Sequence, residues 1–138
     1  FPRGVWRDAF DPGARHWIAR DARGDLVAAA RLTVHGRLDD SPDGRVWRDA
    51  GREVPAPVAN IAKLVVRRDA RRKGLATWLD RLRIEAAWAM GARSITVTAS
   101  ANQARLLARF GFLDTGIRVR FDNRPGVPFR ALELLRPR

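Results

Sequence analysis

The residues with the most chemical potential in this chain form one short basic run. Five basic side chains occupy the seven positions 67–73, and Gly74 follows them. Such a run is typical of a nucleic-acid-binding patch, of a solvated surface, or of a binding site for one particular anion. It stands where a strand pattern gives way to a helix pattern, and there the unpaired N–H groups of a first helical turn add to the positive field. Gly74 and the small Ala76 let a ligand approach the backbone, so a pyrophosphate group fits this arrangement well.

Hydrophobic spacing indicates the elements that position this run. Residues 59–66, ANIAKLVV, are apolar and β-branched and predict one mostly buried strand. From Gly74 the period changes to that of a helix, which Gly91 ends. Arg81, Arg83 and Glu85 are predicted to lie away from its apolar face. That face comprises Leu75, Trp78, Leu79, Leu82, Ala86, Ala89 and Met90.

The remaining elements complete a mixed sheet. A helix is predicted over 102–110, capped by Asn102 and closed by Gly111. Residues 36–58 are rich in Gly, Pro and Asp and predict a long loop excursion, of a kind that is often functional. The order β-β-loop-β-α-β-α-β-β predicts a single α/β domain over 1–138. The other strands are expected at 16–21, 26–35, 93–99, 116–121 and 129–135.

Composition narrows the classes of function. The 138 residues carry a net charge of +12 with only two lysines, which favours anionic partners, although arginine-rich composition alone explains the charge equally well. The absence of cysteine excludes disulfides and thiolate chemistry, and two histidines make a metal site improbable, so no metal is expected. No apolar run approaches the ~20 residues of a membrane span and no signal peptide opens the chain, so a cytoplasmic protein is expected.

The basic run and its neighbours resemble the GNAT acetyltransferase superfamily. The family's pyrophosphate motif, Arg/Gln-x-x-Gly-x-Gly/Ala, is matched from Arg71 to Ala76. Asn102 followed by Gly111-Phe112 is similar to its second signature, and the resemblance covers about residues 16–135. It implies an α/β fold with a mixed, mostly antiparallel central sheet and a β-α-β acyl-CoA-binding core. The N-terminal part is short or incomplete for this family, since the chain begins at Phe1 and little precedes His16.

The resemblance also implies the residues that bind acetyl-CoA, the expected co-substrate. The strand before the loop would splay from its neighbour and bind the pantetheine arm with its free backbone groups. The loop would hold the pyrophosphate, and Asn102 and Arg109 would flank the arm and the nucleotide. The full implied set is Leu64, Val65, Val66, Arg71, Arg72, Lys73, Gly74, Leu75, Ala76, Thr77, Asn102 and Arg109.

The catalytic positions depart from the family pattern. Leu107 stands where many members have a tyrosine acid, and Asn60 stands where a glutamate base is common. Asn60 could orient a water. His35 is the best-placed titratable side chain, although a structural role for it carries more weight, and Glu133 is a weaker candidate base.

The acceptor is expected beside the 36–58 excursion. Trp47 is the proposed contact, with equal weight given to a solvated or partner-facing loop. The local acidity that would attract an amine comes from Asp39, Asp40, Asp43, Asp49 and Glu53.

These observations favour an acyl-CoA-dependent N-acyltransferase. The expected reaction is direct attack of a primary amine, on a small molecule or a protein, on acetyl-CoA. Three alternatives stay open: a CoA-binding regulatory domain without catalysis, a basic nucleic-acid-binding module, and an enzyme similar to acyl-homoserine-lactone synthases. No specific nucleic acid and no membrane are expected as partners, and a homodimer is left open.

Overall fold

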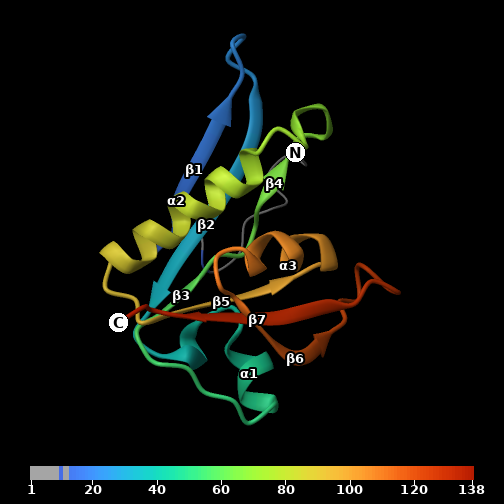
Figure 1. Cartoon of the computed structure of the whole chain (residues 1–138). Coiled ribbons are helices and arrows are strands. Elements are labelled where there is room, and N and C mark those ends of the chain that lie inside the picture. Colours follow the sequence, from blue (N-terminus) through green and yellow to red (C-terminus); the bar gives the residue numbers. More distant parts are fainter. Residues whose placement is uncertain (1–9, 11–12) are drawn as a thin grey trace.

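A twisted sheet of seven strands forms the centre of the molecule (Figure 1). The computed structural model describes residue 10 and residues 13–138. The strands follow the order β1-β2-β3-β5-β7-β6, and β4 pairs with β2 beside this path. Only β3 and β5 run parallel; the other pairs are antiparallel. The strands are β1 (Arg15–Arg20), β2 (Leu26–His35), β3 (Val58–Asn60), β4 (Val65–Val66), β5 (Ser94–Ala99), β6 (Leu113–Val119) and β7 (Phe129–Leu135).

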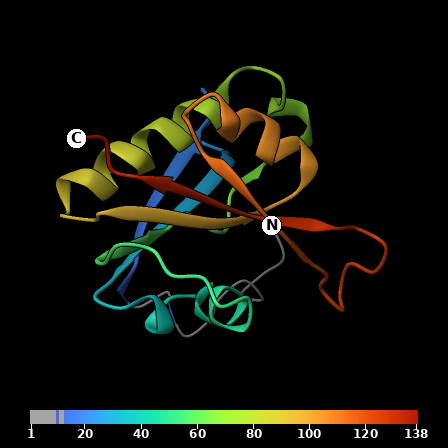
Figure 2. The same ribbon diagram turned by 60° about the horizontal axis from the view of Figure 1, so that its bottom comes forward.

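Helices cover the two faces of the sheet unequally. The long helix α2 (Leu75–Ala89) and the shorter α3 (Ala101–Ala108) lie on one face, and the excursion with α1 (Gly44–Asp49) lies on the other (Figures 1 and 2). Two 3-10 turns, η2 (Leu38–Asp40) and η3 (Arg68–Ala70), complete the elements of the described chain. Among the described residues, no helix has the length and apolar character needed to cross a membrane.

The two faces of the sheet differ in chemistry. On the helical face, Leu32, Ile61, Ile84, Ile95 and Leu132 belong to one buried hydrophobic cluster with side chains of α2 and α3. The opposite face carries buried polar side chains beneath the excursion. We call this set the polar layer: Thr33, Asn60, Thr96, Thr98 and Glu133 from the strands, with Asp43 from the excursion. Such a layer folds only if its groups find hydrogen-bond partners.

The predicted strand over 59–66 is in fact two strands. β3 pairs in parallel with β5, but among the described residues β4 pairs only with β2, where Val65 lies opposite Ala29. Between them Lys63 takes a positive φ of 58°, which turns the chain away from β5. A continuous apolar run predicts burial but does not reveal where a strand changes partners. Residues 1–9 and 11–12 lie outside the described residues.

Helix α2 buries a different face from the predicted one. Arg83 was expected at the surface but is 1% exposed, whereas Trp78 was expected in the core and is 52% exposed. The buried positions are Leu79, Asp80, Arg83, Ile84 and Ala87. The strand break beneath α2 leaves carbonyl groups without partners in the sheet. The face of α2 that carries Arg83 is buried because Arg83 donates hydrogen bonds to these carbonyls.

Three further expectations are corrected. Ser100, not Asn102, is the N-cap of α3: its hydroxyl accepts a hydrogen bond from the backbone N–H of Gln103, in a capping box. The excursion is not purely a loop, because it contains α1. The strand expected at 116–121 begins earlier, at Leu113, with a register shift between Asp114 and Arg118.

Candidate acyl-CoA groove and its polar layer

The chain turns away from β5 at residues 61–62, and side chains of β3 and α2 form hydrogen bonds with the backbone there. Arg83 Nη1 donates to the carbonyls of Ile61 and Ala62, at 2.5 and 3.3 Å, and to the carbonyl of Arg31 on β2, at 3.1 Å. Asn60 Oδ1 accepts the backbone N–H of Ala62 at 3.0 Å. These bonds replace the sheet pairing that residues 61–62 give up, so the separation of β4 from β5 is a fixed feature of the fold.

Arg83 is buried with its own counter-charge. Its Nη2 lies 2.5 Å from Asp80 Oδ1, one turn earlier on α2. Burial raises the pKa of Asp80 and lowers the pKa of Arg83, and the opposite charge of each partner works against these shifts. The pair therefore places a cation beneath the strand break without leaving a single uncompensated charge in the core.

An open groove of about 780 Å³ lies along β4. One wall comes from β4, the basic loop and the start of α2, and the other comes from α3 and the β6–β7 hairpin. Eleven of the twelve residues that the sequence assigns to acyl-CoA line it, and only Lys73 does not. Those eleven are Leu64, Val65, Val66, Arg71, Arg72, Gly74, Leu75, Ala76, Thr77, Asn102 and Arg109.

The basic loop has the backbone of an anion cradle. Arg72 and Gly74 both take left-handed conformations, with φ of 65° and 78°, just before α2 begins. Alternation of this kind turns successive N–H groups toward one side. A Cβ at Gly74 would meet nothing within 4 Å, so that side of the loop is open space. Arg71 Nε donates to the carbonyl of Val66 at 3.0 Å and ties the loop to β4.

The far wall contains residues that the sequence did not indicate. Arg124 and Phe129 line the groove from the β6–β7 hairpin, and the guanidinium carbon of Arg124 lies 5.5 Å from the Phe129 ring centroid. Phe121 packs edge-on against the same ring. Only the tertiary fold brings this hairpin to the basic loop, so no local signal could have predicted it. Asn102 and Arg109 sit on exposed positions of α3, and the Asn102 side-chain oxygen accepts a bond from Arg105.

Asp43 is a carboxylate of the excursion that is buried against the sheet. One oxygen accepts a bond from Asn60 Nδ2 at 2.7 Å, and the other accepts one from Thr98 Oγ1 at 3.1 Å. Burial raises the pKa of Asp43 to about 6, and the hydrogen bonds from Thr98 and Asn60 limit that rise. The sequence named Asp43 only as one of several acidic residues of the excursion; no pattern could have shown that it alone is buried against β3 and β5.

His35 and Asn60, the proposed catalytic residues, both have partners within the protein. His35 lies six residues along β2 from Ala29, the partner of Val65, so about 20 Å of strand separates it from β4. Its Nε2 pairs with Thr33 Oγ1 at 2.8 Å, and its pKa is lowered by burial. Asn60 uses both amide protons within the protein, on Asp43 and on the carbonyl of Thr96, so it does not hold a water with them.

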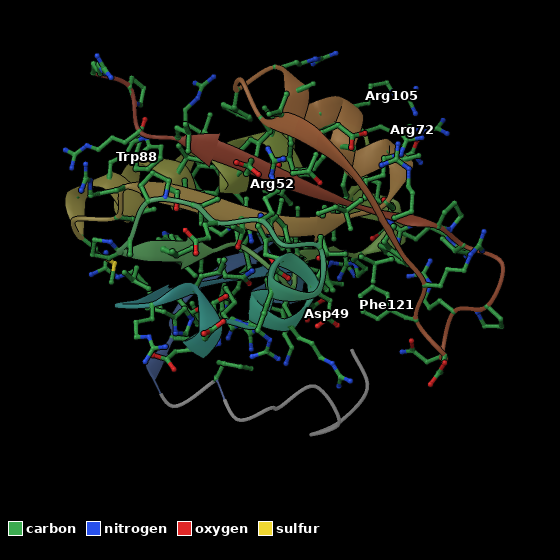
Figure 3. The ribbon with its side chains drawn as sticks, turned by 90° about the horizontal axis from the view of Figure 1, so that it is seen from below. Asp49, Arg52, Arg72, Trp88, Arg105 and Phe121 are labelled. Atoms are coloured by element: carbon green, nitrogen blue, oxygen red, sulfur yellow. The ribbon has the colours of Figure 1, made fainter. Side chains whose placement is uncertain are left out.

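Trp47 and Glu133 also have internal roles. Trp47 is 0% exposed beneath the excursion, so it offers no surface to an acceptor. Glu133 accepts an ion-paired hydrogen bond from Arg52, which reaches from the excursion to β7 (Figure 3). In the part of the chain that the structure describes, no group of three His, Asp or Glu side chains is gathered as a metal site would require.

Comparison with known proteins identifies the fold. The sequence matches the family model described as acetyltransferase (GNAT) family over residues 2–112. A GCN5-related N-acetyltransferase from Kribbella flavida shares the fold with a TM-score of 0.64 and 20% identity, over 90% of this chain and 68% of that chain. TofI, solved in a ternary complex with an inhibitor and MTA, gives a TM-score of 0.70 and 21% identity, over 94% of this chain and 68% of that chain.

A third solved structure is similar to the same extent. Arabidopsis thaliana NAA60, in complex with a bisubstrate analogue, gives a TM-score of 0.65 and 17% identity, over 89% of this chain and 75% of that chain. The family match covers most of the chain, and the sheet of these neighbours is the sheet described above. The chain therefore belongs to the acetyltransferase (GNAT) family and is a GNAT-type acetyltransferase.

Proposed function

We propose that this enzyme transfers an acetyl group from acetyl-CoA to a primary amine by direct attack. The observation that carries the proposal is the groove between β4 and α3, whose basic end is the left-handed loop before α2. Cations, unpaired N–H groups and open space above Gly74 meet there, which suits a pyrophosphate. The residues present therefore fit acetyl-CoA.

The pantetheine arm would lie along β4. In the described chain this strand pairs only with β2, so its other edge is available to a ligand. A backbone N–H near Val65 or Val66 would polarise the thioester carbonyl, and the fixed strand break would hold the thioester in one place. Leu107 leaves no phenol for the departing sulfur, but a thiol with a pKa near ~8.5 departs with little help from an acid.

The acceptor amine would approach from the face that the excursion covers. This face ends at the β6–β7 hairpin, where Phe129 and Arg124 border the groove. The amine belongs to a small molecule or a protein. We assign the substrate contact to Phe129 and Arg124 rather than to Trp47, because Trp47 is fully buried.

Titration with CoA tests the proposal. Gly74→Glu places bulk and negative charge in the open space of the loop, and we expect it to abolish CoA binding. Gly24→Glu is the matched control, because Gly24 has a φ of 85° and equally open surroundings in the β1–β2 turn. Equal CoA affinity in the two variants would reject this site. An amine screen with thiol release as readout would then identify the acceptor.

A further inference from the structure

A buried carboxylate lies one hydroxyl away from a small cavity at the strand break, and this cavity shares residues with the groove. Asp43 is 6% exposed, and its two oxygens bind Asn60 on β3 and Thr98 on β5. These two strands are neighbours up to Asn60, opposite Thr96, and separate beyond that pair. Asp43 therefore lies at the strand break, on the face of the sheet that the excursion covers.

Thr98 lies between this carboxylate and a small cavity next to the groove; the cavity and the groove share Leu64, Asp80 and Gln103. Thr98 lines this cavity of about 30 Å³ with Ile61, Leu64, Gln103 and Leu107, between the strand break and α3. Its side chain is only half-buried, while its hydroxyl donates to Asp43. Asn60 is no rival for this role, since its amide protons are already bonded within the protein.

We propose that Asp43 accepts, through the Thr98 hydroxyl, the proton that the acceptor ammonium must lose before it attacks. This inference rests on the proposed function and names the proton acceptor of that same reaction. The family's usual glutamate position holds Asn60, and the excursion supplies a carboxylate to the same point of the sheet.

The proton transfers balance. The ammonium N–H bond breaks as its proton passes to the Thr98 oxygen, and the Thr98 proton passes to Asp43. The neutral amine then bonds to the thioester carbon, and the C–S bond breaks. The departing thiolate takes a second proton from the nitrogen of the adduct, and Asp43 releases its proton to water. The amide, free CoA thiol and one proton are the products.

The pH dependence follows from the neighbours of Asp43. Its pKa near 6 reflects burial first and hydrogen bonds second, with no charged side chain among the causes. As a proton acceptor it must be ionised, so the rate should fall as pH falls through about 6. The charged or titratable side chains that share this face include His16 of β1, Arg31 and His35 of β2, Glu133 of β7 and Arg52 of the excursion.

The test compares acetylation rates from pH 5 to 9, after an acceptor is found, in the wild type and five variants. We expect Asp43→Asn to lower kcat at pH 7 by about 100-fold or more and to remove the fall of rate near pH 6. Thr98→Val should do the same, and Thr98→Ser should restore most of the rate. Thr33→Val is the control, because it removes a buried hydroxyl of the same face that bonds His35 instead. His35→Gln should leave kcat unchanged.

CoA affinity and thermal unfolding of each variant separate chemistry from folding. Asp43→Asn should bind CoA as the wild type does. Wild-type kcat in Asp43→Asn with the same acid limb would overturn the inference and leave the proposed function standing. An equal loss at every pH, with lowered stability, would also overturn it, in favour of a structural role. If Asp43→Asn fails to fold, the Thr98 pair decides, and equal rates for Thr98→Val and Thr98→Ser overturn it. If wild-type protein neither binds CoA nor releases thiol, both proposals fall.

Discussion

Asp43 should make folding less favourable at the pH where it would serve catalysis. Its folded pKa is about 6 against 3.8 for the ordinary carboxyl. Below pH 3.8 both states hold the proton and there is no cost. As pH rises through 3.8 the unfolded chain ionises first, so stability falls until the folded carboxyl ionises as well, near pH 6. Above that pH the full cost applies, about 3 kcal/mol from the size of the shift.

The same logic predicts a stabilised variant. An asparagine at position 43 can accept the bond from Asn60 and donate to Thr98, and it carries no charge to bury. We expect Asp43→Asn to raise the free energy of unfolding at pH 7.5 by about 1–3 kcal/mol, with a smaller gain at pH 5. Urea unfolding at the two pH values measures the difference. A gain that grows toward acid pH would contradict the raised pKa.

Among the elements, the basic loop and α2 were predictable and the strand break was not. Gly74 followed by helical spacing locates the start of α2 to the residue, because backbone conformation and apolar period both change there. The break between β3 and β4 depends on Asn60 and Arg83, which are polar residues buried by contacts far along the chain. Local pattern assigns such residues to the surface, so the same missing information placed Arg83 in solvent and merged two strands into one.

The role of Arg83 in the strand break leads to a prediction. Arg83→Met removes the donor from the carbonyls of residues 61 and 62 and leaves Asp80 buried without its partner. We expect a loss of about 3–5 kcal/mol in unfolding free energy, together with weaker CoA binding as β4 loses its hold. Arg81→Met, on the exposed side of the same helix, should change neither quantity. Equal urea midpoints for the two variants would show that the break is held by other contacts.

At the scale of the whole molecule, the net charge of +12 determines how the protein binds polyanions. Arginine charge alone gives weak binding to nucleic acid without sequence preference. We expect the affinity for a labelled DNA duplex, followed by fluorescence polarisation, to fall by about 100-fold or more between 50 and 200 mM salt. Excess CoA should reduce it further by occupying the loop. Tight binding at 200 mM salt that ignores CoA would favour a nucleic-acid-binding role.

The open edge of β4 has a consequence for self-association. An unpaired strand edge can template the addition of a strand from another copy, and proteins protect such edges by keeping them short and flanking them with charge. Here the edge is two residues long, with Lys63 before it and Arg67 and Arg68 after it. A second copy would bring the same cations to the same edge and be repelled, whereas an anionic ligand would be attracted. The arginines that suit the groove to an anion thus also help to keep the empty protein from aggregating through its own sheet.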